Sequence, residues 1–237
     1  SSLEDWVSIF DADNGNNQEM IFEVQGSSLS GQGTAVSNLF TPRNAGLSGS
    51  GFGGNNKLKP LFINNMIDKF DNRYQNSIIT QYETATRQFN INPWSTGYIP
   101  TNLETGNTLG TLWQVWTAKY IDTEATTEYT SRQNWHVIRL ADVYLMRAEA
   151  SAEILSDPSA ANSDINILRS RVGMTGIDYS SISMQDFREQ ILRERAVELY
   201  MEGHRFFDLT RFGVYDEYCR FVYGNTDGAR QAEDYTW

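Results

Sequence analysis

Apolar residues recur at helical spacing in the second half of the chain. After Trp135 they step by three or four residues along one stripe, which predicts a helix that Asp157-Pro158 ends. The stripe consists of Val137, Leu140, Ala141, Tyr144, Ala148, Ala152 and Leu155. A second helix is predicted over residues 164–172, where Gly173 stops it. The chain is therefore predicted to become helical from Trp135 onward.

A third helix has the clearest start signal. Ser183 is a suitable N-cap, and Asp186 stands three residues later, as in a capping box. Gly203 offers the C-terminal break. The apolar face that this helix would bury consists of Phe187, Ile191, Leu192, Ala196, Leu199 and Tyr200. Three successive amphipathic helices predict helix hairpins packed as a layer.

The first half of the chain has shorter and weaker patterns. Residues 19–25 alternate apolar and polar side chains and predict a short strand. The glycines within residues 41–57 indicate an irregular surface loop, and residues 61–70 have apolar positions at helical spacing. Residues 74–135 show no sustained period, so we expect one or two strands and long loops. The predicted fold class is mainly α, with a loop-rich region that contains short strands.

Composition narrows the class of protein. The chain has 237 residues, of which 40% are hydrophobic, and this is enough for a packed core. A net charge of −11 argues against nucleic acid as a partner. Cys219 is the only cysteine, so the chain has neither an internal disulfide nor a four-cysteine metal site. The most apolar stretch, residues 137–154, contains too many charged residues to span a bilayer.

Two motifs match nucleotide and metal sites only formally. Residues 49–54 fit GxGxxG, but no buried strand precedes them and no helix follows, so we reject a dinucleotide site. Residues 11–19 offer oxygen ligands suited to calcium. Asn16 and Phe22, however, stand where an EF-hand loop needs Gly and Glu. A polar turn is the preferred interpretation, and we expect no cofactor and no metal.

The charged segment between Leu192 and Gly213 has a helical arrangement of carboxylates. Its glutamates step by four residues, but Glu202-Gly203-His204 lacks the Glu-x-x-His spacing of helical di-metal sites. The arginines at 193, 195, 205 and 211 could neutralise all three glutamates, so we favour a structural lattice of ion pairs over a catalytic site. The predicted lattice consists of Arg193, Glu194, Arg195, Glu198, Glu202, Arg205 and Asp208. His136 has no evident partner for a catalytic triad, and no catalytic residue is predicted.

Aromatic residues provide the candidate ligand site. Trp113 and Trp116 lie in an apolar segment that is typical of a core. Trp94 lies in a polar loop that contains Pro and Gly, and an aromatic face in such a loop can stack on a sugar ring or a peptide side chain. The candidate ligand-binding residues are therefore Trp94, Asn92 and Tyr98.

Several segments, taken in order, resemble the SusD/RagB family. They are EMIFEVQ at 19–25, the Gly-rich loop, Asp71-Asn72-Arg73, Ala118-Lys119-Tyr120, WHVIRLADVYLMRAEA from Trp135, INILRSRVG, and ILRERAVELYMEGHRFFDLTRFG. The resemblance covers nearly the whole chain and corresponds to the C-terminal half of the family. It implies a mainly α fold with helix hairpins of the tetratricopeptide-like type. Along the chain it implies a loop-rich ligand-side part over 1–134, a helical scaffold over 135–213 and the start of an incomplete tail over 214–237.

The same resemblance implies a function. Members of the family are lipoproteins on the outer membrane of Bacteroidota, and they capture glycans, or peptides in the RagB-like branch. They work with a SusC-type TonB-dependent transporter and carry no catalysis of their own. For this chain the resemblance implies a lipid anchor through an N-terminal Cys that is not present in the sequence.

Two other functions remain open from the sequence. One is a polysaccharide-active hydrolase that uses loop carboxylates such as Asp122, Glu124 or Glu128. The other is a helix-hairpin interaction module without a small ligand. Release of reducing ends by the purified protein separates the first of these from a binding protein.

Overall fold

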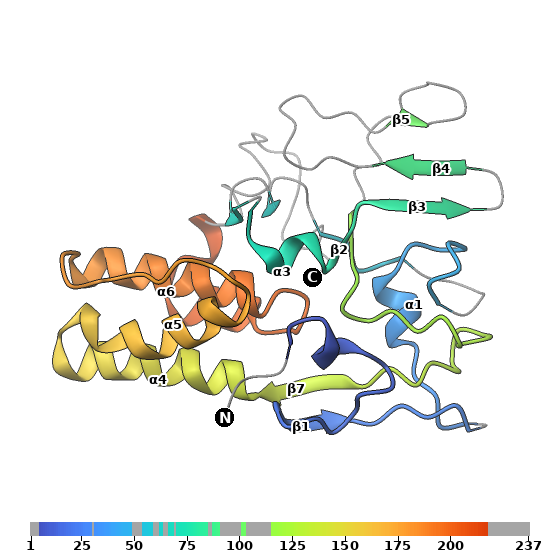
Figure 1. The fold of residues 1–237 in the computed structure, drawn as a ribbon, viewed down its shortest axis with the longest axis horizontal. Helices are drawn as coiled ribbons and strands as arrows, with labels where there is room; N and C mark the ends of the chain where they lie inside the picture. Colours follow the sequence, from blue (N-terminus) through green and yellow to red (C-terminus); the bar gives the residue numbers. More distant parts are fainter. Residues whose placement is uncertain are drawn as a thin grey trace.

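The computed structural model shows a layer of helices beside a region of small sheets and loops (Figure 1). The structure describes residues 5–29, 31–48, 54–58, 62–63, 66–68, 70–84, 87–90, 101–102 and 115–217. This architecture agrees with the predicted fold class, because the helices gather in the second half of the chain and the strands of the first half are short.

Four helices form the layer: α4 (Leu140–Leu155), α5 (Asn162–Arg171), α6 (Met184–Glu198) and α7 (Arg205–Arg211). The turn η2 (Pro158–Ala161) joins α4 to α5. The predicted capping box is confirmed: the Ser183 hydroxyl accepts the Asp186 N–H at 3.1 Å, and the Asp186 carboxylate accepts the Ser183 N–H. Between α4, α5 and α6 lies an apolar core that includes Leu145, Ile165, Leu168, Phe187 and Ile191. None of the described helices has the length and apolar character needed to cross a bilayer.

The prediction that the helix begins at Trp135 was wrong for its first five residues. Trp135–Arg139 form strand β7, which pairs antiparallel with β1 (Met20–Val24), and α4 starts at Leu140. A short apolar run fits either period, and here a strand far away in the sequence decides between them. The pairing turns His136 and Arg139 into the interior.

The end of α6 also differs from the prediction. The helix ends at Glu198, with Leu199 as its C-cap, and not at Gly203. Met201 and Gly203 have φ angles of 61° and 89°, and they belong to the turn that leads into α7. Glu202 therefore lies beyond the helix, although it stands at helical spacing from Glu198.

The described part of residues 74–135 contains more strands than the one or two expected. β2 (Ile78–Ile79) pairs with β6 (Trp116–Thr117), while β3 (Gln81–Thr84), β4 (Arg87–Asn90) and β5 (Thr101–Asn102) form an antiparallel sheet in that order. The shorter helices are η1 (Ser8–Phe10), α1 (Val36–Phe40) and α3 (Asn72–Gln75). Of the described residues within the helical pattern at 61–70, residues 62, 63 and 66 are helical, whereas residues 67, 68 and 70 are not.

Candidate functional site

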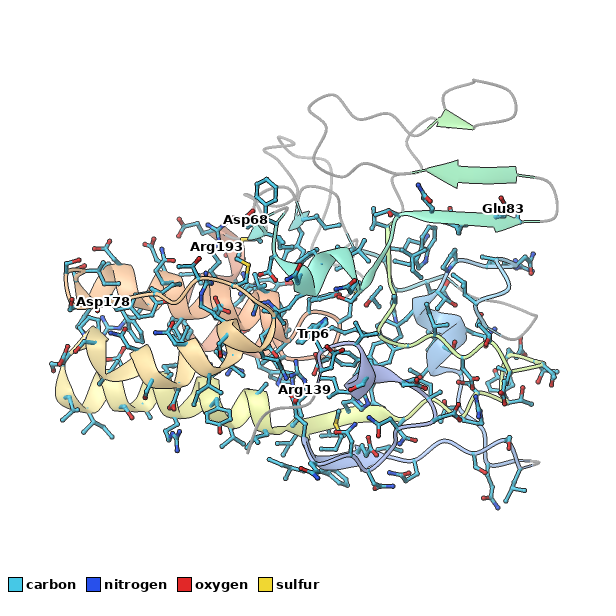
Figure 2. The ribbon with its side chains drawn as sticks, in the orientation of Figure 1. Trp6, Asp68, Glu83, Arg139, Asp178 and Arg193 are labelled. Carbon is cyan, nitrogen blue, oxygen red and sulfur yellow. The ribbon has the colours of Figure 1, made fainter. Side chains whose placement is uncertain are left out.

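Opposite charges from several distant segments meet around the C-terminal end of α6. We call this group the ionic cluster, and its side chains are all buried. Its members are Glu19, Asp71, Arg73, Lys119, Arg139, Arg171, Glu194, Glu198 and Glu202. Figure 2 labels Trp6 and Arg139, which lie side by side at this junction, with the guanidinium 5.3 Å from the indole ring.

Arg139 occupies the middle of the ionic cluster, because the β1–β7 pairing directs it inward. Its Nη1 lies 2.8 Å from both Glu19 Oε1 and Glu198 Oε1, and its Nε lies 2.7 Å from Glu202 Oε2. Its Nη2 donates to the Glu198 backbone oxygen at 2.7 Å and to Glu202 Oε1 at 2.9 Å. One guanidinium therefore joins β1, β7 and the end of α6.

Arg73 approaches α6 from the opposite side. Its Nη2 lies 2.6 Å from Asp71 Oδ2, and its Nη1 lies 2.7 Å from Glu194 Oε1 and 3.0 Å from Glu198 Oε2. Asp71 also caps α3 by accepting the Arg73 N–H at 3.0 Å. The short helix α3 is thus fixed to successive turns of α6.

Two further cations, Arg171 and Lys119, belong to the ionic cluster. Arg171, at the end of α5, has its Nη1 2.6 Å from Glu19 Oε2 and also pairs with Glu198. Lys119 Nζ lies 2.6 Å from Glu202 Oε1 and donates to the backbone oxygens of Glu198 and Tyr200. The rings of Trp6, Phe10 and Tyr200 surround this ammonium at 4.8, 4.8 and 3.9 Å. Aromatic faces stabilise a buried cation in such an arrangement.

The electrostatics of the ionic cluster favour the charged forms of Glu198 and Glu202. Burial acts against the charged form, but Arg139 and Lys119 outweigh it and lower the pKa of Glu202 to about 2. Arg171, Arg139 and Arg73 likewise hold the pKa of Glu198 well below its usual range, although burial opposes them. Burial lowers the pKa of Lys119 to about 8. Ionised, fully paired carboxylates suit a rigid joint and do not suit a general acid.

The partners predicted for the glutamates were wrong. Arg193 donates to the Met66 backbone oxygen, and Arg205 donates to the Leu192 backbone oxygen. Arg195 forms a separate group inside the helical layer, where it pairs with Asp142 and Asp208 at 2.8 Å each. The glutamates bind cations that lie far away in the sequence. All of these cations stand within the segments that carry the family resemblance, and that placement was the available signal; they are Arg73, Lys119, Arg139, Arg169 and Arg171.

Glu19, the last carboxylate of the candidate calcium loop at 11–19, belongs to the ionic cluster. Glu19 accepts from Arg139 and Arg171, so it does not turn toward Asp11 or Asp13. Within the ranges that the structure describes, no group of His, Cys, Asp or Glu could hold a metal ion. Of the GxGxxG motif at 49–54, residues 49–53 lie outside the described residues.

The candidate catalytic groups are held in structural contacts. Burial lowers the pKa of His136, whose Nε2 lies 3.6 Å from Glu23 Oε2. Burial would raise the pKa of Asp122, but hydrogen bonds from Arg132 reverse this effect and lower it. Arg132 also pairs with Glu124 at 3.2 Å. A carboxylate fixed in its charged form beside an arginine is a poor proton donor for glycoside hydrolysis.

The predicted ligand residues Asn92, Trp94 and Tyr98 lie outside the described residues, between β4 and β5 in the sequence. Trp113 also lies outside them, whereas Trp116 is buried, as predicted for a core residue. Trp135 stacks on Tyr120 with ring centroids 5.6 Å apart.

The sequence matches known proteins over nearly its full length. Residues 9–236 match the SusD family. SusD-like protein P25 of Formosa agariphila is 40% identical over 96 residues, which are 40% of this chain and 18% of that protein. Starch-binding protein SusD of Bacteroides thetaiotaomicron is 41% identical over 80 residues, which are 33% of this chain and 13% of that protein.

Solved structures show the same fold. A laminarin binding SusD-like protein superimposes with a TM-score of 0.63 at 25% identity, covering 96% of this chain and 49% of that one. A SusD homolog from Bacteroides thetaiotaomicron gives a TM-score of 0.68 at 23% identity, covering 94% and 47%. The chain thus spans about half the length of these solved relatives, and smaller shares of the two curated proteins are matched. From the match over residues 9–236 and the shared fold, we conclude that this chain belongs to the SusD family.

Proposed function

We propose that this chain is part of a cell-surface protein that binds glycans for uptake through a partner TonB-dependent transporter of the SusC type. Family membership carries the proposal, together with two relatives whose names give their ligands, starch and laminarin. The protein would be held on the outer membrane by a lipid anchor. A peptide ligand is the alternative within the same class of binding protein.

The described residues support binding rather than catalysis. The carboxylates of the ionic cluster are paired and buried, Glu198 and Glu202 are held in their charged form, and Asp122 is fixed by Arg132. These paired and buried charges make the scaffold rigid. A binding surface needs such a scaffold to hold its loops in place.

We divide the roles along the chain as the family resemblance implies. Residues 1–134 would provide the ligand side, residues 135–213 the scaffold, and residues 214–237 a tail. On the ligand side, Trp94 would stack on a sugar ring while Asn92 and Tyr98 donate or accept hydrogen bonds.

Calorimetric titration of the full chain tests the proposal. Starch, laminarin, other soluble polysaccharides and a mixture of peptides are added separately. We expect one polysaccharide to bind, and we expect Trp94→Ala to weaken binding at least about tenfold, or ~1.4 kcal/mol. Phe207→Ala is the matched control, because Phe207 is also an exposed aromatic residue but lies on α7 in the helical layer.

Each outcome has a distinct meaning. If only peptides bind, the protein belongs to the peptide-binding branch. If Trp94→Ala leaves the affinity unchanged, the assignment of Trp94 to the ligand site is wrong. Release of reducing ends from a polysaccharide contradicts the proposal in favour of the hydrolase. Co-purification with a β-barrel transporter, without any soluble ligand, favours the interaction module.

A further inference from the structure

The strands β2–β6, which we call the β lobe, begin and end side by side. β2 opens the lobe and β6 closes it, and the two pair directly, with Ile78 opposite Thr117 and Ile79 opposite Trp116. The sheet β3–β4–β5 lies between them in the sequence. Figure 1 shows α3 and β2 between α6 and this sheet. In the part of the chain that the structure describes, this two-stranded stem is therefore one connection between the β lobe and the helical layer.

A buried cation stands beside each strand of the stem. Arg73 lies in α3, just before β2, and Lys119 follows β6 by two residues. Arg73 contacts Glu194 and Glu198 in α6, whereas Lys119 contacts Glu202 and the backbone oxygens of Glu198 and Tyr200. Both sides of the stem are thus attached to the same end of α6.

Uncharged contacts fill the space between the two cations. The Tyr200 hydroxyl donates to the Ser77 backbone oxygen at 2.9 Å, and Trp6 Nε1 donates to the Ser77 hydroxyl at 3.2 Å. The Ala118 N–H donates to the same Ser77 backbone oxygen at 2.8 Å. Ser77, immediately before β2, is therefore tied to the residues that follow α6 and β6.

We propose that Arg73 and Lys119 are positioning residues, which clamp the stem of the β lobe to the carboxylates and backbone oxygens at the end of α6. Charged hydrogen bonds are directional, so they fix an angle that apolar packing would leave adjustable. Glu194 and Glu198 in α6 anchor one side of the stem, and Glu202 in the turn after α6 anchors the other. The consequence for ligand affinity rests on the proposed function, because the candidate ligand residues lie between β4 and β5 in the sequence.

The test compares two buried arginine substitutions by hydrogen–deuterium exchange. Arg73→Lys keeps the charge but cannot maintain contacts with Asp71, Glu194 and Glu198 at once, since an ammonium lacks the planar fork. We expect exchange in β2, β3, β4 and β6 to be at least tenfold faster, with α4 and α5 changed less than threefold. Arg195→Lys is the matched control, because Arg195 is also buried and lies on α6, but among the described residues it pairs only with Asp142 and Asp208 inside the helical layer.

A second variant covers a failure of Arg73→Lys to fold. Lys119→Met removes the other cation while Arg139 continues to neutralise Glu202, and it should also accelerate exchange in the β lobe. Equal acceleration across the whole protein in Arg73→Lys or Lys119→Met overturns the inference. So does acceleration of the β lobe in Arg195→Lys.

Titration with laminarin provides a readout that a purely structural role would not move. We expect the affinity to fall about tenfold in Arg73→Lys and Lys119→Met and to be unchanged in Arg195→Lys. If the unsubstituted protein binds no polysaccharide, the proposed function fails, and the exchange pattern still decides whether the clamp exists. Normal affinity in a variant with an accelerated β lobe contradicts the positioning role.

Discussion

The helix α6 contributes residues to two apolar clusters and to the ionic cluster, and the apolar core that it shares with α4 and α5 differs from the ionic cluster in chemistry. Toward α4 and α5 it buries Phe187 and Ile191 in an apolar core. At its C-terminal end it buries Glu194 and Glu198 among arginines. The apolar core joins helices that follow one another along the chain, whereas the ionic cluster joins residues as far apart as Glu19 and Arg171.

The difference shows what each kind of contact is used for. Helix hairpins bring their apolar faces together through short connections, so non-directional burial is enough to hold them. Segments from distant parts of the sequence have many possible ways of meeting. A set of ion pairs that must all be satisfied selects one of these arrangements, because an unpaired buried charge costs far more than a poorly packed methyl group.

Of the substitutions that distinguish the ionic cluster from the apolar core, one at Arg139 should have the largest effect on the free energy of unfolding. We expect Arg139→Met to lower the free energy of unfolding by about 3–5 kcal/mol, because it leaves Glu19, Glu198 and Glu202 with fewer partners. Urea denaturation measures the change. Arg188→Met is the control: Arg188 pairs with Glu153 on the surface, and such pairs contribute about 0–1 kcal/mol. Similar losses in the two variants would contradict the comparison.

Local patterns in the sequence predicted the apolar interior well. The helical period and the Ser183–Asp186 cap gave α6 its start and its buried face, and both depend on residues within one or two turns. Trp135–Arg139 shows where this reasoning fails. Its apolar spacing fits a helix, but β1, more than a hundred residues earlier, makes it a strand.

The ionic interior could be predicted only in outline. The sequence indicated that Glu194, Glu198 and Glu202 are structural carboxylates. Spacing alone, however, gave no reason to prefer their observed partners over Arg193, Arg195 and Arg205. Which arginine reaches which glutamate depends on the direction of each side chain in the folded chain, and spacing alone does not contain that information. The ligand residues around Trp94 stay a prediction from the sequence.

The apolar interior should respond to truncation with the next largest effect. Leu145 is fully buried between the helices, and we expect Leu145→Ala to cost about 2–5 kcal/mol through lost burial and the cavity left behind. Thermal and urea unfolding at pH 7 give the value. Met146→Ala, at an exposed position on the same helix, should cost less than ~1 kcal/mol. A loss as small in Leu145→Ala as in Met146→Ala would show that the helical layer is loosely packed.

Lowering the pH should reduce the contribution of the ionic cluster to the free energy of unfolding. The contribution of the apolar core should stay unchanged, because its members do not titrate. The pKa of Glu202 is lowered from 4.5 to about 2 in the folded protein, so the unfolded chain takes up this proton first as the pH falls. The stabilisation is therefore complete above pH 4.5 and disappears toward pH 2, and for Glu202 alone it amounts to about 3 kcal/mol.

Urea midpoints at several pH values between 5 and 2 test this assignment. Glu202→Gln should give a shallower dependence of stability on pH than the unsubstituted protein. Leu145→Ala should give a parallel dependence at lower stability, because it removes no titratable group. If the curve of Glu202→Gln runs parallel to that of the unsubstituted protein, the loss of stability in acid comes from other carboxylates.

The smallest effect is expected at the helix cap, where the interaction is the most local. Ser183→Ala removes the hydroxyl that accepts the Asp186 N–H, and we expect a loss of about 1 kcal/mol in the free energy of unfolding. Ser181→Ala, an exposed turn position two residues earlier, should change it by less than ~0.5 kcal/mol. If Ser183→Ala matched Arg139→Met in its cost, the short-range signals that are easiest to find in the sequence would also dominate the stability. We expect the opposite, since the largest energies here belong to contacts between residues that the sequence keeps farthest apart.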